Sequence, residues 1–271
     1  MNLSNWIIEI DITHKCNMRC RHCNRLCNAE KMYGTYRDHK EIEIKHIDFL
    51  CNEILKHPKG KVHLLRIIGG EPLLSPILDY TVSRFEELVK YGFAQEINIV
   101  TNGTVEPSPK SLPYLMYSPM CIKDMIKAKG RVLTTEEVYN IKNVKHRNIT
   151  ISPIDYNCEY HICDRVNVCG IQFSVYGFSY TAACFPAMYV SQLNHKRFLH
   201  HLPNSIDEFF DKDFETDVCS ICVSAITDYN KLILEKPEVQ SEEYLGPKWD
   251  RLIKQNQVVF VEPNTSWINM M

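Results

Sequence analysis

The residues with the clearest chemical capacity are three closely spaced cysteines, Cys16, Cys20 and Cys23, in the sequence CNMRCRHC. Their spacing lets three thiolates converge on one metal centre, and soft sulfur ligands select iron–sulfur clusters, zinc or copper(I). An ordinary electron-transfer [4Fe–4S] cluster takes four cysteines, so a site with three would leave one iron open to another ligand. The three cysteines therefore indicate a metal centre, with an open coordination position if that metal is iron.

Two other metal sites are compatible with the same segment. Zinc could be bound by these cysteines with His14 or His22 as a further ligand, since C-x2-C pairs are common in zinc sites. Alternatively, Cys27 could supply the fourth thiolate of a closed iron–sulfur cluster. The spacing alone leaves these alternatives open.

The composition limits the partners that we expect. The chain has 271 residues, of which 45% are hydrophobic, enough for a substantial core in one or two domains. Lysine and arginine number 31 against 33 aspartates and glutamates, which gives a formal net charge of −2. A basic excess would be expected of a protein that binds nucleic-acid phosphates or anionic membranes. The charge balance therefore argues against nucleic acid and against a membrane as partners.

The sequence predicts neither a membrane span nor a secretory leader. The longest apolar runs, at residues 6–8 and 258–261, are too short to cross a bilayer, and the first residues lack a basic n-region and a long hydrophobic segment. We expect a cytoplasmic protein. In a reducing compartment, 12 cysteines indicate metal or redox chemistry rather than disulfides.

Hydrophobic periodicity predicts the elements that position these residues. Residues 41–56 and 76–91 have the spacing of amphipathic helices, and Gly92 would end the second one. Short apolar segments predict strands at 6–12, 62–68 and 96–100, with less regular candidates for strands at 114–122 and 148–154 and for a helix at 136–143. Alternating strands and helices predict an α/β fold with a parallel sheet or barrel.

Three motifs directly follow the first three predicted strands. They are CNMRCRHC after the first strand, Gly69-Gly70-Glu71-Pro72 after the second and Thr101-Asn102-Gly103 after the third. Functional sites in parallel α/β folds are built at the carboxyl ends of the strands. We therefore expect all three motifs to contribute to a site there.

The CNMRCRHC and GGEP motifs, in this order and at strand ends, resemble the signature of the radical S-adenosylmethionine (SAM) superfamily. The resemblance covers residues 6–155. It implies that Cys16, Cys20 and Cys23 hold a [4Fe–4S] cluster whose open iron is chelated by SAM. It also implies a partial (β/α)6 TIM-like barrel, which we expect for residues 1–156.

The resemblance further implies the cofactor-binding residues and the chemistry. Residues 69–72 would hold the SAM amino group through their backbone and the Glu71 carboxylate, and Thr101 and Asn102 would form a further cofactor-binding element. His22 replaces a residue that is usually aromatic and helps to seat adenine, and an imidazole can also stack on a base. One-electron reduction of SAM would yield a 5′-deoxyadenosyl radical that abstracts hydrogen from a substrate, with a flavodoxin or ferredoxin-type protein as the electron donor.

A second group of cysteines lies downstream of these motifs. Four cysteines could bind one zinc ion, as in a zinc ribbon. After a radical SAM core, however, the pattern resembles a Cys-rich twitch subdomain, which holds an auxiliary [4Fe–4S] cluster. We place this subdomain at 157–235, followed by a C-terminal helix and tail at 236–271, and its expected cluster ligands are Cys169, Cys184, Cys219 and Cys222.

A closed auxiliary cluster suits electron transfer. Twitch-bearing members include a cyclitol dehydrogenase, and similarity at that level implies oxidation of a sugar or cyclitol hydroxyl with the auxiliary cluster as electron acceptor. Asp155 is a candidate general base for the hydroxyl proton. A radical epimerase is the alternative, with Cys158 and Cys163 as candidate hydrogen donors, although a structural or buried thiol is the commoner role of a cysteine.

The substrate class is less constrained by the sequence. Basic and histidine residues at 195–201 would suit a phosphorylated or nucleotide-linked substrate, but a solvated surface run is the commoner explanation of such a charge cluster. A peptide- or RNA-modifying radical SAM enzyme is a further alternative. A zinc-stabilised binding module would account for the cysteines and leave the ordered match from CNMRCRHC to GGEP unexplained.

Overall fold

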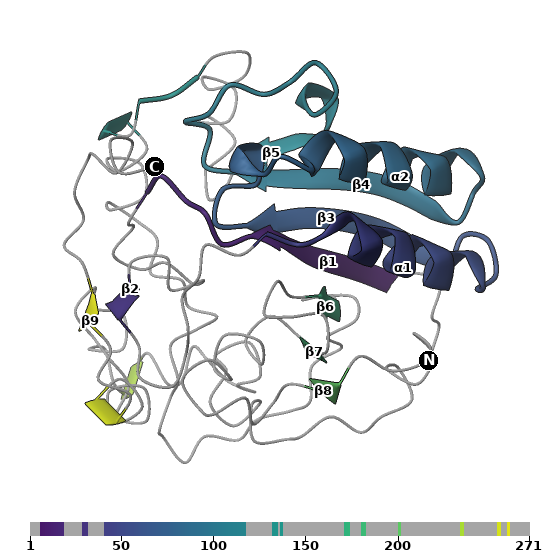
Figure 1. Ribbon diagram of the computed structural model, residues 1–271, viewed down its shortest axis with the longest axis horizontal. Helices are drawn as coiled ribbons and strands as arrows, with labels where there is room; N and C mark the ends of the chain where they lie inside the picture. Colours follow the sequence, from purple (N-terminus) through teal and green to yellow (C-terminus); the bar gives the residue numbers. More distant parts are fainter. Residues whose placement is uncertain are drawn as a thin grey trace.

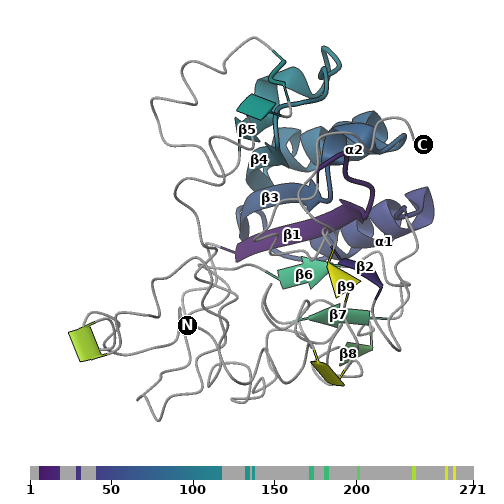
Figure 2. The same ribbon diagram turned by 90° about the vertical axis from the view of Figure 1, so that its left-hand side faces the viewer.

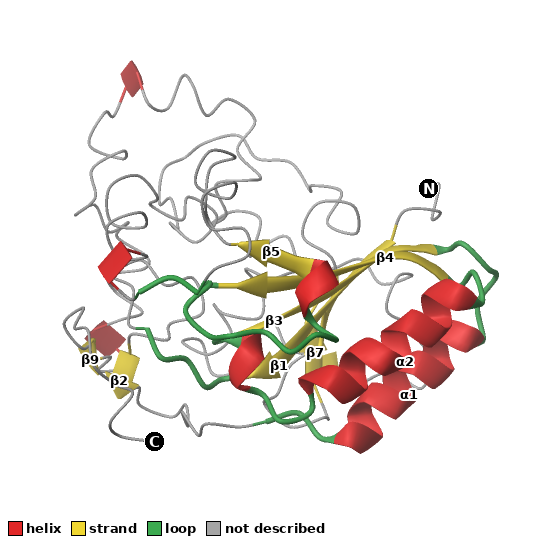
Figure 3. Cartoon of the chain, turned by 90° about the horizontal axis from the view of Figure 1, so that it is seen from above, coloured by secondary structure: helices red, strands yellow, loops and turns green. Residues whose placement is uncertain are grey.

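The computed structural model describes residues 41–117 continuously, together with shorter segments elsewhere in the chain. The described residues are 6–18, 29–31, 41–117, 132–134 and 136–137, with short segments at 171–173, 180–182, 200–201, 234–235, 254–255 and 259–260. Within these residues the chain forms a twisted sheet with two α-helices packed on one face (Figures 1 and 3). The statements that follow concern this part of the chain.

The main sheet has seven strands in the order β5-β4-β3-β1-β6-β7-β8. Strands β5, β4, β3, β1 and β6 are mutually parallel, whereas β7 and β8 continue the sheet in antiparallel fashion beyond β6 (Figure 2). The strands are β1 (Trp6–Thr13), β3 (Val62–Gly69), β4 (Ala94–Thr101), β5 (Leu115–Tyr117), β6 (Ile171–Phe173), β7 (Tyr180–Ala182) and β8 (His200–His201). A separate pair joins β2 (Ala29–Lys31) to β9 (Val259–Phe260).

Strand β1 is the middle strand of the seven-stranded sheet and is buried along its whole length. Its isoleucines alternate with Glu9 and Asp11, so that one face is apolar and the other carries carboxylates. On the polar face, Arg66 of β3 donates a hydrogen bond to Glu9 across 3.0 Å. A buried carboxylate needs such a partner because desolvation of a lone charge is costly. The sheet is thus apolar towards the helices and partly charged on the other face.

Helices α1 (Ile44–Leu55) and α2 (Leu78–Lys90) lie side by side on the apolar face (Figure 3). They belong to the crossovers from β1 to β3 and from β3 to β4, which parallel pairing requires. Their buried sides and the apolar face of the sheet form one core, whose fully buried members include Trp6, Ile8, Ile10, Ile12, Ile47, Leu50, Leu65, Ile67, Val82, Phe85 and Ile99.

The third crossover, from β4 to β5, contains no α-helix. Residues 102–114 connect these strands through a loop with turns and the short 3₁₀ helix η3 (Leu112–Tyr114). Another 3₁₀ helix, η2 (Pro72–Leu74), directly follows β3 and precedes α2. Polar loops consequently occupy the carboxyl ends of β3 and β4, next to the loop that leaves β1.

Most elements predicted for residues 6–117 are confirmed. The predicted strands at 6–12, 62–68 and 96–100 correspond to β1, β3 and β4, and the predicted helices at 41–56 and 76–91 correspond to α1 and α2. Gly92 takes a φ of 78° just beyond α2, as expected of a residue that ends a helix. The strand expected at 114–122 is observed as β5 and begins one residue later, because Tyr114 still belongs to η3.

The larger architecture stays a prediction. The α/β class with a parallel sheet is confirmed, whereas the closure into a partial (β/α)6 barrel and the twitch subdomain depend on segments outside the described residues. The expected strand at 148–154 and most of the expected helix at 136–143 also lie outside them. Among the helices that the structure describes, none is long and apolar enough to span a bilayer.

The core offers a direct test of this arrangement. Phe85 is fully buried between α2 and the sheet, so Phe85→Ala should lower the free energy of unfolding by about 3–5 kcal/mol through lost transfer energy and a residual cavity. Leu112, which is 51% exposed, supplies the control, and Leu112→Ala should change stability by less than about 0.5 kcal/mol. Urea unfolding measures both, and equal midpoints for the two variants would contradict the assigned core.

Candidate functional site

Loops from the carboxyl ends of β1 and β3 are joined by backbone hydrogen bonds. The Gly70 N–H donates to the Thr13 carbonyl and the Glu71 N–H donates to the Lys15 carbonyl, each across 2.7 Å. These bonds continue the β1–β3 pairing past the end of the strands. They hold Cys16, which directly follows Lys15, against the start of the GGEP motif.

Two glycines make this close approach possible. A Cβ added to Gly69 would lie 2.4 Å from the Thr13 carbonyl oxygen, and one added to Gly70 would lie 2.2 Å from the Lys15 carbonyl oxygen. Contacts this short between a side chain and a backbone do not occur in proteins without displacement of one of them. Gly69 also has a φ of 149°, which disfavours any residue with a side chain. The GGEP glycines are therefore required by the packing of the two loops.

The Glu71 carboxylate connects the GGEP loop to the end of β4. Its side chain is fully buried. Oε1 accepts hydrogen bonds from the Thr101 hydroxyl (2.7 Å) and the Leu73 N–H (3.1 Å), and Oε2 accepts one from the Asn102 N–H (2.7 Å). Thr101 Oγ1 in turn accepts the Gly103 N–H across 3.0 Å. Several donors to one carboxylate offset the cost of burying its charge.

The side chain of Asn102 reaches the cysteine loop. Its Nδ2 donates to Asn17 Oδ1 across 3.0 Å and lies 4.0 Å from Cys16 Sγ. Thr104 accepts a hydrogen bond from Asn17 and donates one to Asn102. Cys16, Asn17 and Asn102 are each less than 8% exposed. Thus Asn102 contacts the GGEP carboxylate through its backbone and the cysteine loop through its side chain.

Glu41 fixes the same loops from the side of α1. It accepts hydrogen bonds from Thr13 Oγ1 and Ser75 Oγ, both across 2.9 Å, and Lys15 Nζ lies 3.2 Å from Oε1. The neighbouring backbone contributes as well, because the Ile42 N–H donates a hydrogen bond to the Ile12 carbonyl across 2.9 Å. One carboxylate thereby ties the end of β1, the residue before Cys16 and the turn after GGEP.

The structure brings six of the predicted site residues to one edge of the sheet, Cys16, Gly69, Gly70, Glu71, Thr101 and Asn102, and Pro72 opens the adjoining 3₁₀ turn. The others lie outside the described residues and stay predictions: Cys20, His22, Cys23, Asp155, Cys158, Cys163, Cys169, Cys184, Cys219 and Cys222. No three potential ligands among the described side chains converge as a metal site.

Three residues of the site were not anticipated from the sequence, namely Asn17, Glu41 and Thr104. A signal existed for Thr104, because an asparagine whose side chain accepts the N–H two residues ahead forms an Asx turn, as Asn102 does here across 2.9 Å. Asn17 and Glu41 act through partners distant in sequence, which no local pattern indicates.

Cys51 lies apart from this site. It is buried on α1 within the core, and burial raises the pKa of its thiol to about 12. Metal ligation and nucleophilic chemistry use the thiolate, which is scarce at neutral pH when the pKa is that high. Cys51 is therefore a packing residue.

Among the described residues, Cys16 and Glu71 are compatible with the iron–sulfur cluster and SAM that the resemblance implies. Cys16 would supply a soft sulfur ligand just beyond the carboxyl end of β1, and Asn102 places an N–H near that sulfur. The Glu71 carboxylate faces Thr101 and the Asn102 backbone. Its expected contact with the SAM amino group stays a prediction.

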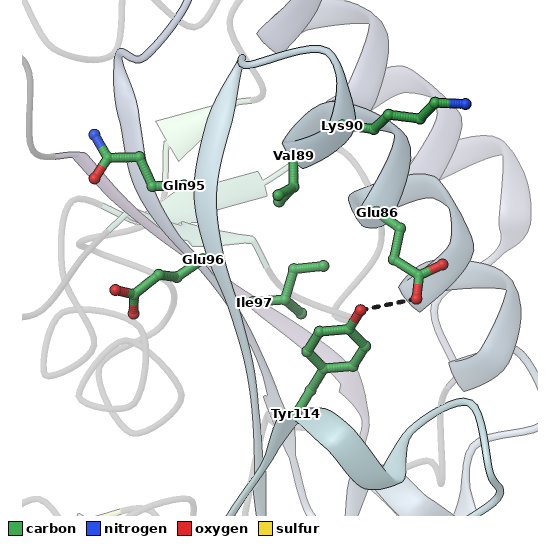
Figure 4. Close-up of a pocket in the computed structure, with 7 residues that line it drawn as sticks. All are labelled: Glu86, Val89, Lys90, Gln95, Glu96, Ile97 and Tyr114. Atoms are coloured by element: carbon green, nitrogen blue, oxygen red, sulfur yellow. Dashed lines mark hydrogen bonds between the residues drawn. The ribbon is translucent and has the colours of Figure 1, made fainter.

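A pocket of about 430 Å³ lies elsewhere, between α2 and the first half of β4 (Figure 4). Tyr114 donates a hydrogen bond to Glu86 across 2.8 Å at one end of it. Its lining residues are Glu86, Val89, Lys90, Gln95, Glu96, Ile97 and Tyr114. Ile97 precedes Asn102 by five residues, about 16 Å along an extended strand. The pocket adjoins the crossover that lacks an α-helix and is separate from the candidate site.

The chain matches no model of a known protein family. It is 30% identical over 98 residues to the GTP 3′,8-cyclases of Brucella ovis and Brucella canis, which covers 36% of this chain and 26% of each cyclase. The chain thus spans about a quarter of the length of the curated relatives that it matches. This similarity supports the resemblance to the radical SAM superfamily that the motifs carry.

Solved structures give partial overlaps. Streptococcus suis SuiB bound to S-adenosylmethionine matches with a TM-score of 0.31 and 18% identity, over 42% of this chain and 24% of that chain. BtrN in complex with AdoMet and 2-DOIA matches with a TM-score of 0.45 and 17% identity, over 76% of this chain and 82% of that chain. Scores below 0.5 do not by themselves establish a common fold.

The hydrogen bond between Thr101 and Glu71 can be tested with a matched pair of variants. Thr101→Val keeps the shape but removes the donor to a buried carboxylate and the acceptor of the Gly103 N–H. It should lower the free energy of unfolding by about 2–3 kcal/mol. Thr101→Ser keeps the hydroxyl and should stay within about 1 kcal/mol of the wild type. Equal stability of the two variants in urea unfolding would show that the contact is energetically unimportant.

Proposed function

We propose that this chain is a radical SAM enzyme that removes hydrogen from a small-molecule substrate. The observation that carries the proposal is the joining of Cys16, Glu71 and Asn102 by hydrogen bonds at the carboxyl ends of β1, β3 and β4. In parallel α/β folds this edge is where reacting groups are bound. The similarity to the GTP 3′,8-cyclases supports the same superfamily.

Under this proposal, Cys16, Cys20 and Cys23 hold a [4Fe–4S] cluster, and the loop at residues 69–72 binds SAM beside it. The bound cofactors supply reductive cleavage of SAM and hence the radical that abstracts hydrogen. The protein's own residues fix the geometry. Glu71 keeps the GGEP backbone in register with the cysteine loop, and Glu41 holds the residues that precede Cys16.

Burial is the second contribution of the chain. Glu71 is fully buried, and Thr101, Asn102 and Cys16 are nearly so. Radical chemistry requires that water and stray hydrogen donors are kept from the reacting centre, and the protein's task with a reactive cofactor is largely this exclusion and the orientation of the substrate. The hydrogen-bonded loops provide a rigid, dry support on one side of the site.

Within this class we propose oxidation of a sugar or cyclitol hydroxyl. Loss of one hydrogen atom from the carbinol carbon, one proton from the hydroxyl and one further electron converts CH–OH to C=O. Asp155 would accept the proton, and an auxiliary [4Fe–4S] cluster on Cys169, Cys184, Cys219 and Cys222 would accept the electron. The proposed setting is the cytoplasm, with a flavodoxin or ferredoxin-type electron donor.

An epimerase is the second candidate, because Cys158 or Cys163 could return a hydrogen atom to the opposite face of the substrate carbon. A phosphorylated or nucleotide-linked substrate fits the basic segment at 195–201, and the relatives that the chain matches in part are named for a nucleotide, GTP. Because that match covers about a quarter of the cyclases' length, we do not propose GTP as the substrate of this chain.

The metal content tests the class of enzyme. After anaerobic reconstitution, the wild-type chain should contain about eight iron atoms in two clusters and form 5′-deoxyadenosine from SAM and dithionite. Cys16→Ala should lower the iron content to about four and abolish 5′-deoxyadenosine. Cys51→Ala is the matched control, since Cys51 lies in the core, and should keep both. Zinc in place of iron, or SAM cleavage by Cys16→Ala, would refute the proposal.

Isotope labelling separates oxidation from epimerisation. Inositols, aminocyclitols and hexose phosphates deuterated at their carbinol carbons serve as substrates. Oxidation should give a ketone and deuterated 5′-deoxyadenosine, and Cys219→Ala should lose the ketone while it keeps SAM cleavage. Incorporation of solvent deuterium at an inverted carbon in D₂O would instead assign the epimerase.

A further inference from the structure

Three side chains around Asn102 form a closed ring of hydrogen bonds. Asn17 Nδ2 donates to Thr104 Oγ1 across 2.7 Å, Thr104 Oγ1 donates to Asn102 Oδ1 across 2.6 Å, and Asn102 Nδ2 donates to Asn17 Oδ1 across 3.0 Å. Each side chain donates once and accepts once within the ring. Such rings restrict every member, because rotation of one side chain breaks two hydrogen bonds.

One backbone group determines the direction of the whole ring. The Thr104 N–H also points to Asn102 Oδ1, across 2.9 Å. A backbone N–H can only donate, so the atom that it meets must be the carbonyl oxygen of the Asn102 amide. The Asn102 NH₂ group is therefore turned towards Asn17 and the cysteine loop. The backbone of Asn102 is held as well, by its N–H donated to Glu71.

The NH₂ group fixed in this way faces a cluster ligand. Asn102 Nδ2 lies 4.0 Å from Cys16 Sγ, and both residues are buried. An N–H directed at a thiolate stabilises negative charge on the sulfur, and hydrogen bonds to cysteine sulfurs are among the factors that set the potential of iron–sulfur clusters. In a buried site this effect is weakly screened.

We propose that Asn102 is a positioning residue that donates to the Cys16 sulfur and raises the reduction potential of the cluster held there. This inference rests on the proposed function, because it requires a cluster on Cys16. Asn17 and Thr104 contribute by orienting the amide. Electron delivery to the cluster should then be easier with Asn102 present than without its NH₂ group.

A redox titration of the reconstituted full-length chain, monitored by EPR, tests the proposal. The signal that changes on addition of SAM identifies the open cluster. Asn102→Ala should shift its midpoint potential to a more negative value, and Asn102→Asp, which keeps the acceptor for the Thr104 N–H but loses the donor and adds charge, should shift it further. Thr104→Val removes one of the two Thr104 groups that orient the amide and should cause a smaller shift. It keeps the backbone N–H that orients the amide, and its midpoint should stay closer to that of the wild type than that of Asn102→Ala.

The possible results separate a failure of this inference from a failure of the proposed function. A wild-type chain that binds no iron at Cys16 overturns both. If the wild type and Asn102→Ala contain equal amounts of iron and have the same midpoint potential, the proposed effect of Asn102 on the potential is refuted and the proposed function is unaffected. Loss of iron from both Asn102 variants while Thr104→Val retains it would assign Asn102 a purely structural role and also overturn the inference.

Discussion

The buried carboxylate of Glu71 is the interaction on which the arrangement of the site depends. It lies at the end of β3 and accepts hydrogen bonds from Thr101 and from the backbone of Asn102, both at the end of β4. A carboxylate without these donors would be costly to bury. The loops after β3 and β4 must therefore fold together. Since the Glu71 N–H also binds the Lys15 carbonyl, the loop after β1 is included in the same unit.

The order of the strands makes this unit possible. β3 lies between β1 and β4, and all three are parallel, so the three loops that leave their carboxyl ends are neighbours. Helices α1 and α2 cover the apolar face and fix the spacing of the strands through the core. A Cβ at position 69 or 70 would collide with the loop after β1, so glycine at both positions allows backbone contact between the first two loops. The strand order brings these loops close together, and the two glycines permit the contact.

Local patterns were sufficient to predict much of the first 117 residues. The isoleucine-rich segments predicted the strands, and the apolar spacing predicted both helices. The motifs at the strand ends indicated Cys16, Glu71 and Asn102 as site residues. The contacts among these residues were not predictable, because partners such as Asn17 and Thr104 are 87 positions apart. Glu41 carries no local signal, and its partner Thr13 is 28 positions away. Pairings of this kind are decided by packing of the whole sheet.

The same geometry separates the cysteines by role. Cys51 lies in the apolar core, and burial raises the pKa of its thiol to about 12. The effect of burial outweighs the attraction of the nearby Arg84 guanidinium, so the neutral thiol is favoured. Cys16 is also buried but lies in the loop after β1, next to the amide of Asn102. Hydrogen bonds to cysteine sulfurs are among the factors that tune iron–sulfur clusters. Under the proposed function, the amide of Asn102 beside its sulfur therefore distinguishes Cys16 from the packing residue Cys51.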